Sequence, residues 1–147
     1  MKKLLQAVKA ELGTRMTGMR AIDIFITPHT NLIPAGTQFP AIGIKDGSIK
    51  RAELMGGDSL DKEMVVTLIP YVKIYPGEKS IIGSGVFKGI LDIVEDIHEV
   101  LDDNFLGIDG MEAAFCGDEK GSEMFGNPED GLQRKIITYT YEKRSER

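Results

Sequence analysis

Four carboxylates in one stretch of the chain have a spacing that suits a metal ion. Asp92 and Asp96 stand four residues apart, as do Glu95 and Glu99, so each pair lies one turn apart on a helix. A hard divalent cation needs several oxygen ligands that converge on one point. Carboxylates that fan along one open helix face converge poorly. These residues therefore predict a stripe that faces water or a partner, with a small metal-dependent hydrolase as the alternative.

The two histidines and the single cysteine offer no evident pair for catalysis. His98 falls near the apolar side of the same stretch, whereas His29 lies in a Pro-rich connection. Cys116 has no basic sequence neighbour to lower the pKa of its thiol, which favours a buried strand thiol over a nucleophile. The sequence predicts neither an active site nor a cofactor.

Two segments resemble phosphate-binding loops but lack the required spacing. The glycines at 83, 85 and 89 are one residue too widely spaced for the GxGxxG motif, and the repeated strand-helix units of a dinucleotide fold are missing. Residues 77–80 contain a Lys-Ser pair without the preceding glycine of a P-loop. We interpret residues 83–89 as a glycine-rich helix entry.

The acidic stripe must be positioned by a helix predicted over residues 83–105, roughly five to six turns long. Ser84 is the predicted N-cap and Gly107 the stop. Seven apolar residues recur at steps of three and four on the side opposite the carboxylates. They are Val86, Ile90, Ile93, Val94, Ile97, Val100 and Leu101.

The N-terminal part predicts a helix followed by a strand. Apolar residues repeat at helical spacing over residues 1–12, and Gly13 ends the pattern. Residues 22–27 alternate with period two, which is typical of a strand with one buried face, here Ile22, Ile24 and Ile26. Residues 29–40 form an irregular, Pro-rich connection.

The next strands are predicted around turn signals. Residues 41–44 and 49–54 predict a hairpin that turns at Asp46-Gly47, followed by a polar connection over residues 55–62. Residues 64–75 are the strongest strand signal. Pro70 interrupts it, so a bulge, an edge position or two shorter strands are allowed there.

After the long helix, residues 111–116 and 132–141 predict two further strands. The second places Ile137, Tyr139 and Tyr141 on one face. Residues 117–131 form an acidic, glycine-containing connection that we expect to be mobile. Residues 142–147 are a charged tail with nothing to bury.

The order is therefore α-β-β-β-α-β-β in a single domain, residues 1–147. Because the strands cluster instead of alternating with helices, we predict an α+β fold with a mainly antiparallel sheet of about five strands and two helices on one face.

Composition narrows the function classes. The net charge of −5 gives no broad attraction to nucleic acid or membrane, and one cysteine favours a reducing compartment. The first residues lack the apolar core of a signal peptide, and no apolar run reaches the length of a spanning helix. A cytoplasmic protein is expected.

The layout as a whole resembles the tail terminator proteins of long-tailed bacteriophages, also called tail completion or tail-to-head joining proteins. The resemblance covers nearly the full chain and depends on the order of five segments and on the kinds of residue in each. These are the opening helix at 2–9, a Pro-delimited strand that ends in residues 39–42, the strong strand at 65–75, the helix at 86–104 with its end at 97–104, and the final strand at 134–141.

The resemblance implies a non-enzymatic structural virion protein. Its copies are expected to form a hexameric ring that caps the tail tube, ends tube polymerisation and joins the head or neck. The implied partners are further copies of the chain, the tail tube protein and the head-closure or neck protein, with genomic DNA passing through unbound. The implied location is the host cytoplasm during assembly and then the virion tail or neck.

We expect acidic residues of segments 117–131 or 44–61 to line the bore or contact the tube, because an acidic bore repels phosphate. The candidate contact residues are Asp118, Glu119, Lys120, Glu123, Glu129, Asp130, Lys50, Arg51 and Asp58. The candidate partner-facing stripe is Asp92, Glu95, Asp96 and Glu99. A head-closure or neck protein of the same particle and a monomeric adaptor remain alternatives.

Overall fold

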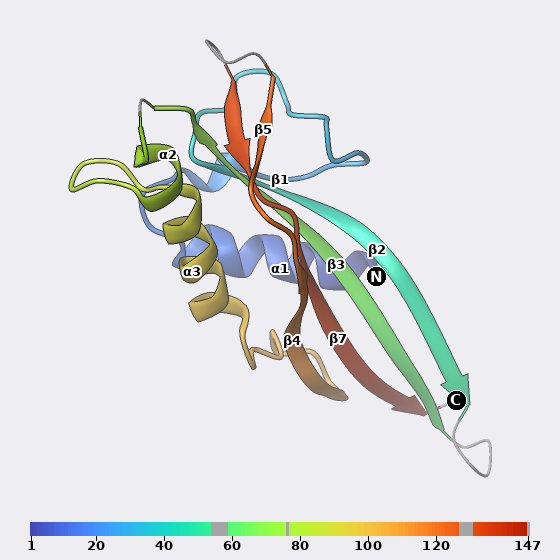
Figure 1. The fold of residues 1–147 in the computed structure, drawn as a ribbon. Coiled ribbons are helices and arrows are strands. Elements are labelled where there is room, and N and C mark those ends of the chain that lie inside the picture. Colours follow the sequence, from blue (N-terminus) through green and yellow to red (C-terminus); the bar gives the residue numbers. More distant parts are fainter. Residues whose placement is uncertain (54–58, 76, 127–130, 147) are drawn as a thin grey trace.

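The computed structural model describes residues 1–53, 59–75, 77–126 and 131–146. They form a mixed α+β fold (Figure 1). The helices are α1 (Lys2–Arg15), a 3₁₀ turn (Ala21–Asp23), α2 (Lys79–Ile82) and α3 (Ile90–Leu101). The strands are β1 (Ile24–Ile26), β2 (Ala41–Glu53), β3 (Ser59–Lys73), β4 (Met111–Glu119), β5 (Glu123–Phe125), β6 (Leu132–Arg134) and β7 (Ile137–Glu146).

The described strands form one seven-stranded sheet in which β3 is central. β2 pairs with one side of β3, and the other side pairs first with β7 and then with β6. β4 extends the sheet beyond β7, and β5 extends it beyond β6. Only the short β1–β2 contact is parallel among these pairs. The prediction of a mainly antiparallel sheet is confirmed, but about five strands was too few.

The helices α1 and α3 pack on the same face of the sheet, as predicted. One buried cluster contains Leu4, Val8 and Leu12 of α1, residues of α3, and the sheet residues that face them. The pairs Val66↔Tyr139 and Leu68↔Ile137 lie in this core, and all four side chains are fully buried. The alternation predicted for residues 137–141 is therefore confirmed.

A second, smaller cluster lies on the opposite face. It contains Phe25, Ala41, Ile69 and Tyr71, covered by side chains of the Pro-rich connection and of β5 and β6. The Tyr71 hydroxyl donates a hydrogen bond to the Thr30 carbonyl oxygen at 2.6 Å. The irregular connection is thus held against the sheet.

The predicted hairpin at Asp46-Gly47 is wrong. β2 runs without a turn from Ala41 to Glu53, and its register against β3 shifts between Asp46 and Ile49. The one extra residue in β2 forms a β-bulge. A side chain at Gly47 would clash with the Val65 carbonyl oxygen, since an added Cβ would lie 2.6 Å from it. The glycine therefore serves close approach of two strands rather than a tight turn.

Pro70 lies within β3, which continues through it without a break. The interruption predicted there occurs in the strands beside β3, where one partner strand ends and another begins. Up to Leu68, β3 pairs with β7, and from Tyr71 it pairs with β6. Pro70 lies at this change of partner, where its carbonyl oxygen accepts a hydrogen bond from the Lys135 amide at 3.3 Å. The missing amide hydrogen thus falls in the gap between β6 and β7.

The long helix is shorter than predicted at both ends. α3 contains 12 residues and begins after Gly89, whose amide donates to the Asp92 carboxylate at 3.0 Å. Ser84 caps only a local turn, because its hydroxyl oxygen accepts from the Val86 and Phe87 amides. The helix ends at Leu101, before Asp103 adopts a positive φ of 55°. Glycines and local hydrogen bonds at the entry therefore outweigh the apolar periodicity.

The predicted buried face of residues 22–27 is right only for Ile24, which is 1% exposed, and wrong for Ile22 and Ile26. Residues 21–23 form a 3₁₀ turn, and Ile22 is 74% exposed whereas Asp23 is 2% exposed. Arg20 donates to both carboxylate oxygens of Asp23, at 2.8 and 3.0 Å, and the Gln38 amide donates to the same carboxylate at 3.0 Å. A satisfied buried carboxylate thus takes the place predicted for an isoleucine.

The C-terminal predictions need two corrections. Residues 117–131 are not a single connection, because β4 continues to Glu119 and Glu123–Phe125 forms β5, which pairs with β6. The predicted charged tail at 142–147 is strand over residues 142–146, since β7 reaches Glu146 and pairs with β3, and Arg147 lies outside the described residues. None of the described helices is long and apolar enough to span a membrane.

Candidate functional site

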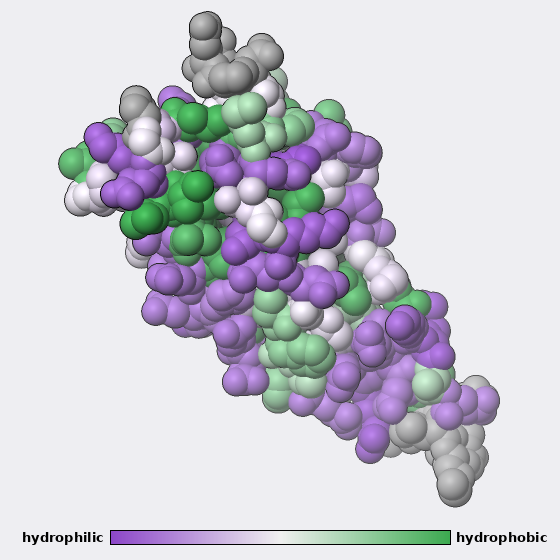
Figure 2. All heavy atoms as spheres, in the orientation of Figure 1, coloured by the Kyte–Doolittle hydropathy of each residue, from purple (hydrophilic) through white to green (hydrophobic). Residues whose placement is uncertain are grey.

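The sheet continues past its helices into a three-stranded extension, the lower right part of Figure 1. The last row across β2, β3 and β7 that contributes to the core is Ile49, Met64 and Tyr141, of which Met64 and Tyr141 are buried and Ile49 is partly buried. We call the part beyond this row the arm: residues 50–53, 59–63 and 142–146. Figure 2 shows that its surface is mostly hydrophilic on the visible side.

The helix-side face of the arm carries three cations in one row. Arg51 pairs with Lys62, and Lys62 pairs with Lys143, so their side chains share one face two residues beyond the last core row. We call these residues the basic row. Among the described residues, no ion pair involves any of the three. Glu53, further along β2 on the same face, adds one negative charge.

The opposite face of the arm is rich in carboxylates. Glu63 pairs directly with Glu142, and Asp61 pairs with Arg144. Arg144 Nε lies 3.3 Å from Asp61 Oδ1 and 3.4 Å from Glu112 Oε1, which stands at a bulge of the adjoining β4. We call Asp61, Glu63, Glu112 and Glu142 the acidic face. They outnumber the two cations on this face, Lys50 and Arg144.

A surface hollow of about 640 Å³ lies against the arm and is lined from both faces, by Lys50, Asp61, Glu63, Glu112 and Glu142 and also by Arg51, Lys62 and Lys143 of the basic row. Two of the predicted contact residues fall here but are separated, because Lys50 and Arg51 are neighbours in β2 and point to opposite faces. Asp58, a third, lies outside the described residues.

The sequence reasoning missed Lys62, Lys143, Glu63 and Glu142. The signal was a period-two alternation of charge in Asp61-Lys62-Glu63 and again in Glu142-Lys143. It was overlooked because the first segment was assigned to a connection and the second to a tail. Once both are strands, alternating signs place opposite charges on opposite faces.

The remaining contact candidates lie at a distance from the arm and are largely paired. Glu119 ends β4 and contacts Lys135 at 3.5 Å, while Glu123 contacts Arg134 at 2.8 Å. Asp118 and Lys120 are exposed beside Glu119. Glu129 and Asp130 lie outside the described residues. The structure therefore does not bring this group together with Lys50 and Arg51.

Two of the four carboxylates in the acidic stripe of α3 are bound by other groups of the chain. Asp92 accepts the Gly89 amide, and Asp96 binds Lys88 Nζ at 2.6 Å. Glu95 and Glu99 are exposed. The described residues contain no group of three or more histidine, cysteine, aspartate or glutamate side chains placed to hold a metal ion.

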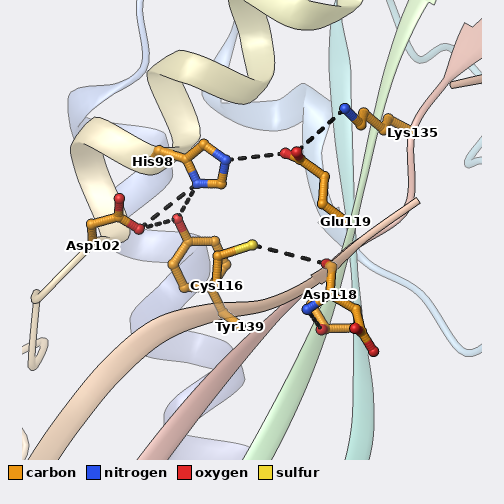
Figure 3. Close-up of polar contacts among 8 residues, drawn as sticks. His98, Asp102, Cys116, Asp118, Glu119, Lys135 and Tyr139 are labelled. Atoms are coloured by element: carbon orange, nitrogen blue, oxygen red, sulfur yellow. Dashed lines mark hydrogen bonds and ion pairs between the residues drawn. The ribbon is translucent and has the colours of Figure 1, made fainter. Parts of the chain in front are cut away.

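A polar network joins α3 to the sheet (Figure 3). The Tyr139 hydroxyl donates to Asp102 Oδ1 at 2.5 Å and lies 2.5 Å from His98 Nδ1. His98 Nε2 lies 3.1 Å from Glu119 Oε1. All three contacts are satisfied together when both ring nitrogens carry a hydrogen, because the hydroxyl has only one to donate. Burial is the main cause of the raised pKa of Tyr139, with the hydrogen bond to Asp102 adding to it.

Cys116 lies beside this network without the properties of a nucleophile. Its Sγ is 3.9 Å from the Asp118 carbonyl oxygen, and burial, with the nearby Glu119 carboxylate, raises the pKa of the thiol. A raised pKa keeps the thiol protonated and unreactive near neutral pH. The other histidine, His29, accepts the Asn31 amide at 3.0 Å within the irregular connection. The network fits a role in fixing α3 on the sheet.

An apolar patch surrounds α2 and the start of α3, visible as green spheres at the upper left of Figure 2. Tyr75 stacks on Phe87 with ring centroids 4.4 Å apart. The exposed members are Ile81, Ile82, Val86, Phe87 and Leu91. Apolar side chains gathered in this way are typical of contact surfaces.

Neither a scan against models of protein families nor a search of curated proteins finds a match for this chain.

Proposed function

We propose that this chain is a structural virion protein of the tail-terminator type and not an enzyme. Its copies would form a ring, most simply a hexamer, that caps the tail tube, ends its polymerisation and joins the head or neck. The partners are further copies of the chain, the tube protein and a head-closure or neck protein. The location is the tail or neck of the virion.

The observation that carries this proposal is the arm. β2, β3 and β7 continue past the row of Ile49, Met64 and Tyr141 into a segment in which the side chains of residues 50–53, 60–63 and 142–144 are exposed or half-buried. A ring of identical copies needs two different surfaces on each copy that fit one another. An extended arm on a helix-covered body supplies such surfaces, and the sheet-and-helix layout agrees with the resemblance of the sequence.

The polar side chains of the described residues also agree with a structural role. The His98 network joins α3 to the sheet of the same chain. Of the α3 carboxylates, Asp92 caps the helix and Asp96 forms an ion pair with Lys88, whereas the other two are exposed to solvent. The acidic residues near the end of β4 stay candidates for the bore, where negative charge would repel phosphate.

The proposal is tested by sedimentation and negative-stain microscopy of the purified chain over a wide concentration range. We expect ring-shaped particles with a central opening and about six times the 16.2 kDa mass of one chain. The same experiment separates the ring from a monomeric adaptor. A chain that sediments as a monomer at every concentration would overturn the proposal.

A further inference from the structure

We propose that the two faces of the arm bind each other between copies of this chain. The basic row of one copy lies against the acidic face of the next copy. This contact rests on the proposed ring, and it assigns the surfaces that build it.

The first argument is the cost of these charges within a single chain. Lys62 stands directly opposite Lys143, and in the adjacent row Glu63 stands directly opposite Glu142. Like charges directly opposite each other across antiparallel strands are destabilising. Exchanging one residue of each pair would remove both repulsions, yet the chain keeps a majority of cations on one face and a majority of carboxylates on the other, although Lys50 stands opposite Glu63 and offsets part of the second repulsion. Such an arrangement becomes favourable when a second copy supplies the opposite sign.

The second argument is the register of the charges. The basic row occupies three consecutive strands, β2, β3 and β7. Glu63, Glu142 and Glu112 also occupy three consecutive strands, β3, β7 and β4. Neighbouring strands lie about 4.8 Å apart in any sheet. Two arms stacked face to face and shifted by one strand therefore place each cation opposite one glutamate.

The third argument concerns symmetry. The two faces belong to the same arm but differ in sign, so the contact joins unlike surfaces of successive copies. A contact of this heterologous kind propagates from copy to copy and closes a ring when the rotation allows. The stacking of arms thus fits the assembly that the proposed function requires.

The test uses two double charge reversals. Lys62→Glu with Lys143→Glu makes both faces of the arm acidic, and Glu63→Lys with Glu142→Lys makes both faces basic. Each variant replaces the like-charge pair between β3 and β7 with another like-charge pair, while Arg51 gains an opposite charge across from it in the first variant and Lys50 loses one in the second. We expect each variant alone to need at least about tenfold more protein to form rings, because like charges now meet between copies.

An equimolar mixture of the two variants is the decisive part of the experiment. In a ring in which the two variants alternate, the reversed basic row of one variant meets the reversed acidic face of the other, and the two unreversed faces meet each other, so every contact of an even-numbered ring joins opposite charges. We expect ring formation to return to within about threefold of the wild-type chain. A mixture that fails to form rings, from variants with wild-type circular dichroism, overturns the contact.

The matched control is Lys73→Glu with Lys9→Glu, which reverses two exposed lysines, one at the other end of β3 and one on α1. This control should assemble like wild type. If the arm variants also assemble like wild type, the contact is wrong while the ring stands. If wild type itself stays monomeric, the proposed function fails instead. Loss of duplex DNA binding on reversal of the basic row, with assembly unchanged, would assign that row to nucleic acid.

Discussion

The same three strands, β2, β3 and β7, build two regions of unlike character. In the body, beneath α1 and α3, the paired residues Leu68 and Ile137 are fully buried. In the arm, the paired residues Lys62 and Lys143 are charged and only half-buried. The backbone ladder is continuous through both regions. The difference therefore comes from the side chains and from what covers them.

This comparison separates stability from assembly. Burying apolar surface contributes roughly 25 cal/mol per Å², whereas an exposed ion pair contributes about 0–1 kcal/mol. The body should therefore carry most of the free energy of unfolding, and the arm should be held in shape by the strands that the body anchors. The predictions below test that contrast, beginning with the largest expected effect.

The largest loss is expected from Ile97→Ala in α3. Ile97 is fully buried in the main core, so the change leaves a cavity and should lower the free energy of unfolding by about 2–5 kcal/mol. Urea denaturation at neutral pH measures this value. Val86→Ala is the matched control, since Val86 is 84% exposed. Equal losses for the two variants would contradict the division between covered and uncovered positions.

The next effect is expected at Asp23, the buried carboxylate at the edge of the body. Asp23→Ala removes the acceptor for Arg20 and the Gln38 amide, and should cost about 1–3 kcal/mol at pH 7. Arg20 holds the pKa of Asp23 below its ordinary value of 3.8. The contribution of the carboxylate is thus present above pH 3.8 and is lost as the pH falls through the folded pKa.

The pH dependence supplies the check on that assignment. The difference between wild type and Asp23→Ala in the free energy of unfolding should be largest near neutral pH and should shrink below pH 3.8. Urea denaturation curves over an acid series measure it. A difference that stays constant down to pH 2 would show that Asp23 acts by packing alone.

A smaller effect is expected from the two buried tyrosines of β7. Tyr139→Phe removes the hydroxyl that bonds Asp102 and contacts His98, and should cost about 1–2 kcal/mol. Tyr141→Phe should cost close to nothing, because its buried hydroxyl has no hydrogen-bond partner among the described residues. Thermal and urea denaturation of both variants provide the comparison. A larger loss for Tyr141→Phe would contradict this reading of the core.

The smallest effect on unfolding is expected in the arm. Arg144→Ala removes the ion pairs with Asp61 and Glu112, all three side chains being more than two-fifths exposed. We expect a change below about 0.5 kcal/mol, smaller still in high salt, since solvent screens such pairs. Urea denaturation at low and high salt measures it. A loss as large as that of Ile97→Ala would mean that the arm stabilises the body.

The sequence predicted the covered half of the fold well. Period-two and period-3.6 patterns identify α1, the core of α3, and the strands around Val66 and Tyr139, because burial selects apolar residues at the spacing of each element. The class of fold and the single helix-covered face follow from the order of these elements. The burial of Asp23 in place of Ile22 was missed, since the Gln38 amide that helps to satisfy the carboxylate is remote in sequence.

The candidate site was predicted poorly for the same physical reason. In the arm no apolar face marks the strands, so segments 59–63 and 142–146 looked like a connection and a tail. The bulge at Gly47 looked like a turn, because Asp-Gly favours turns in isolation and only the approach of Val65 shows otherwise.

What the chain alone determined is where apolar surface must be hidden, since hydrophobic burial depends on residue type and spacing. What only the tertiary structure decided is which charges share a face, because Lys62 and Lys143 are 81 positions apart in sequence and meet only through strand pairing. Coulomb interactions depend on distance in space, and that distance is set by the register of the sheet.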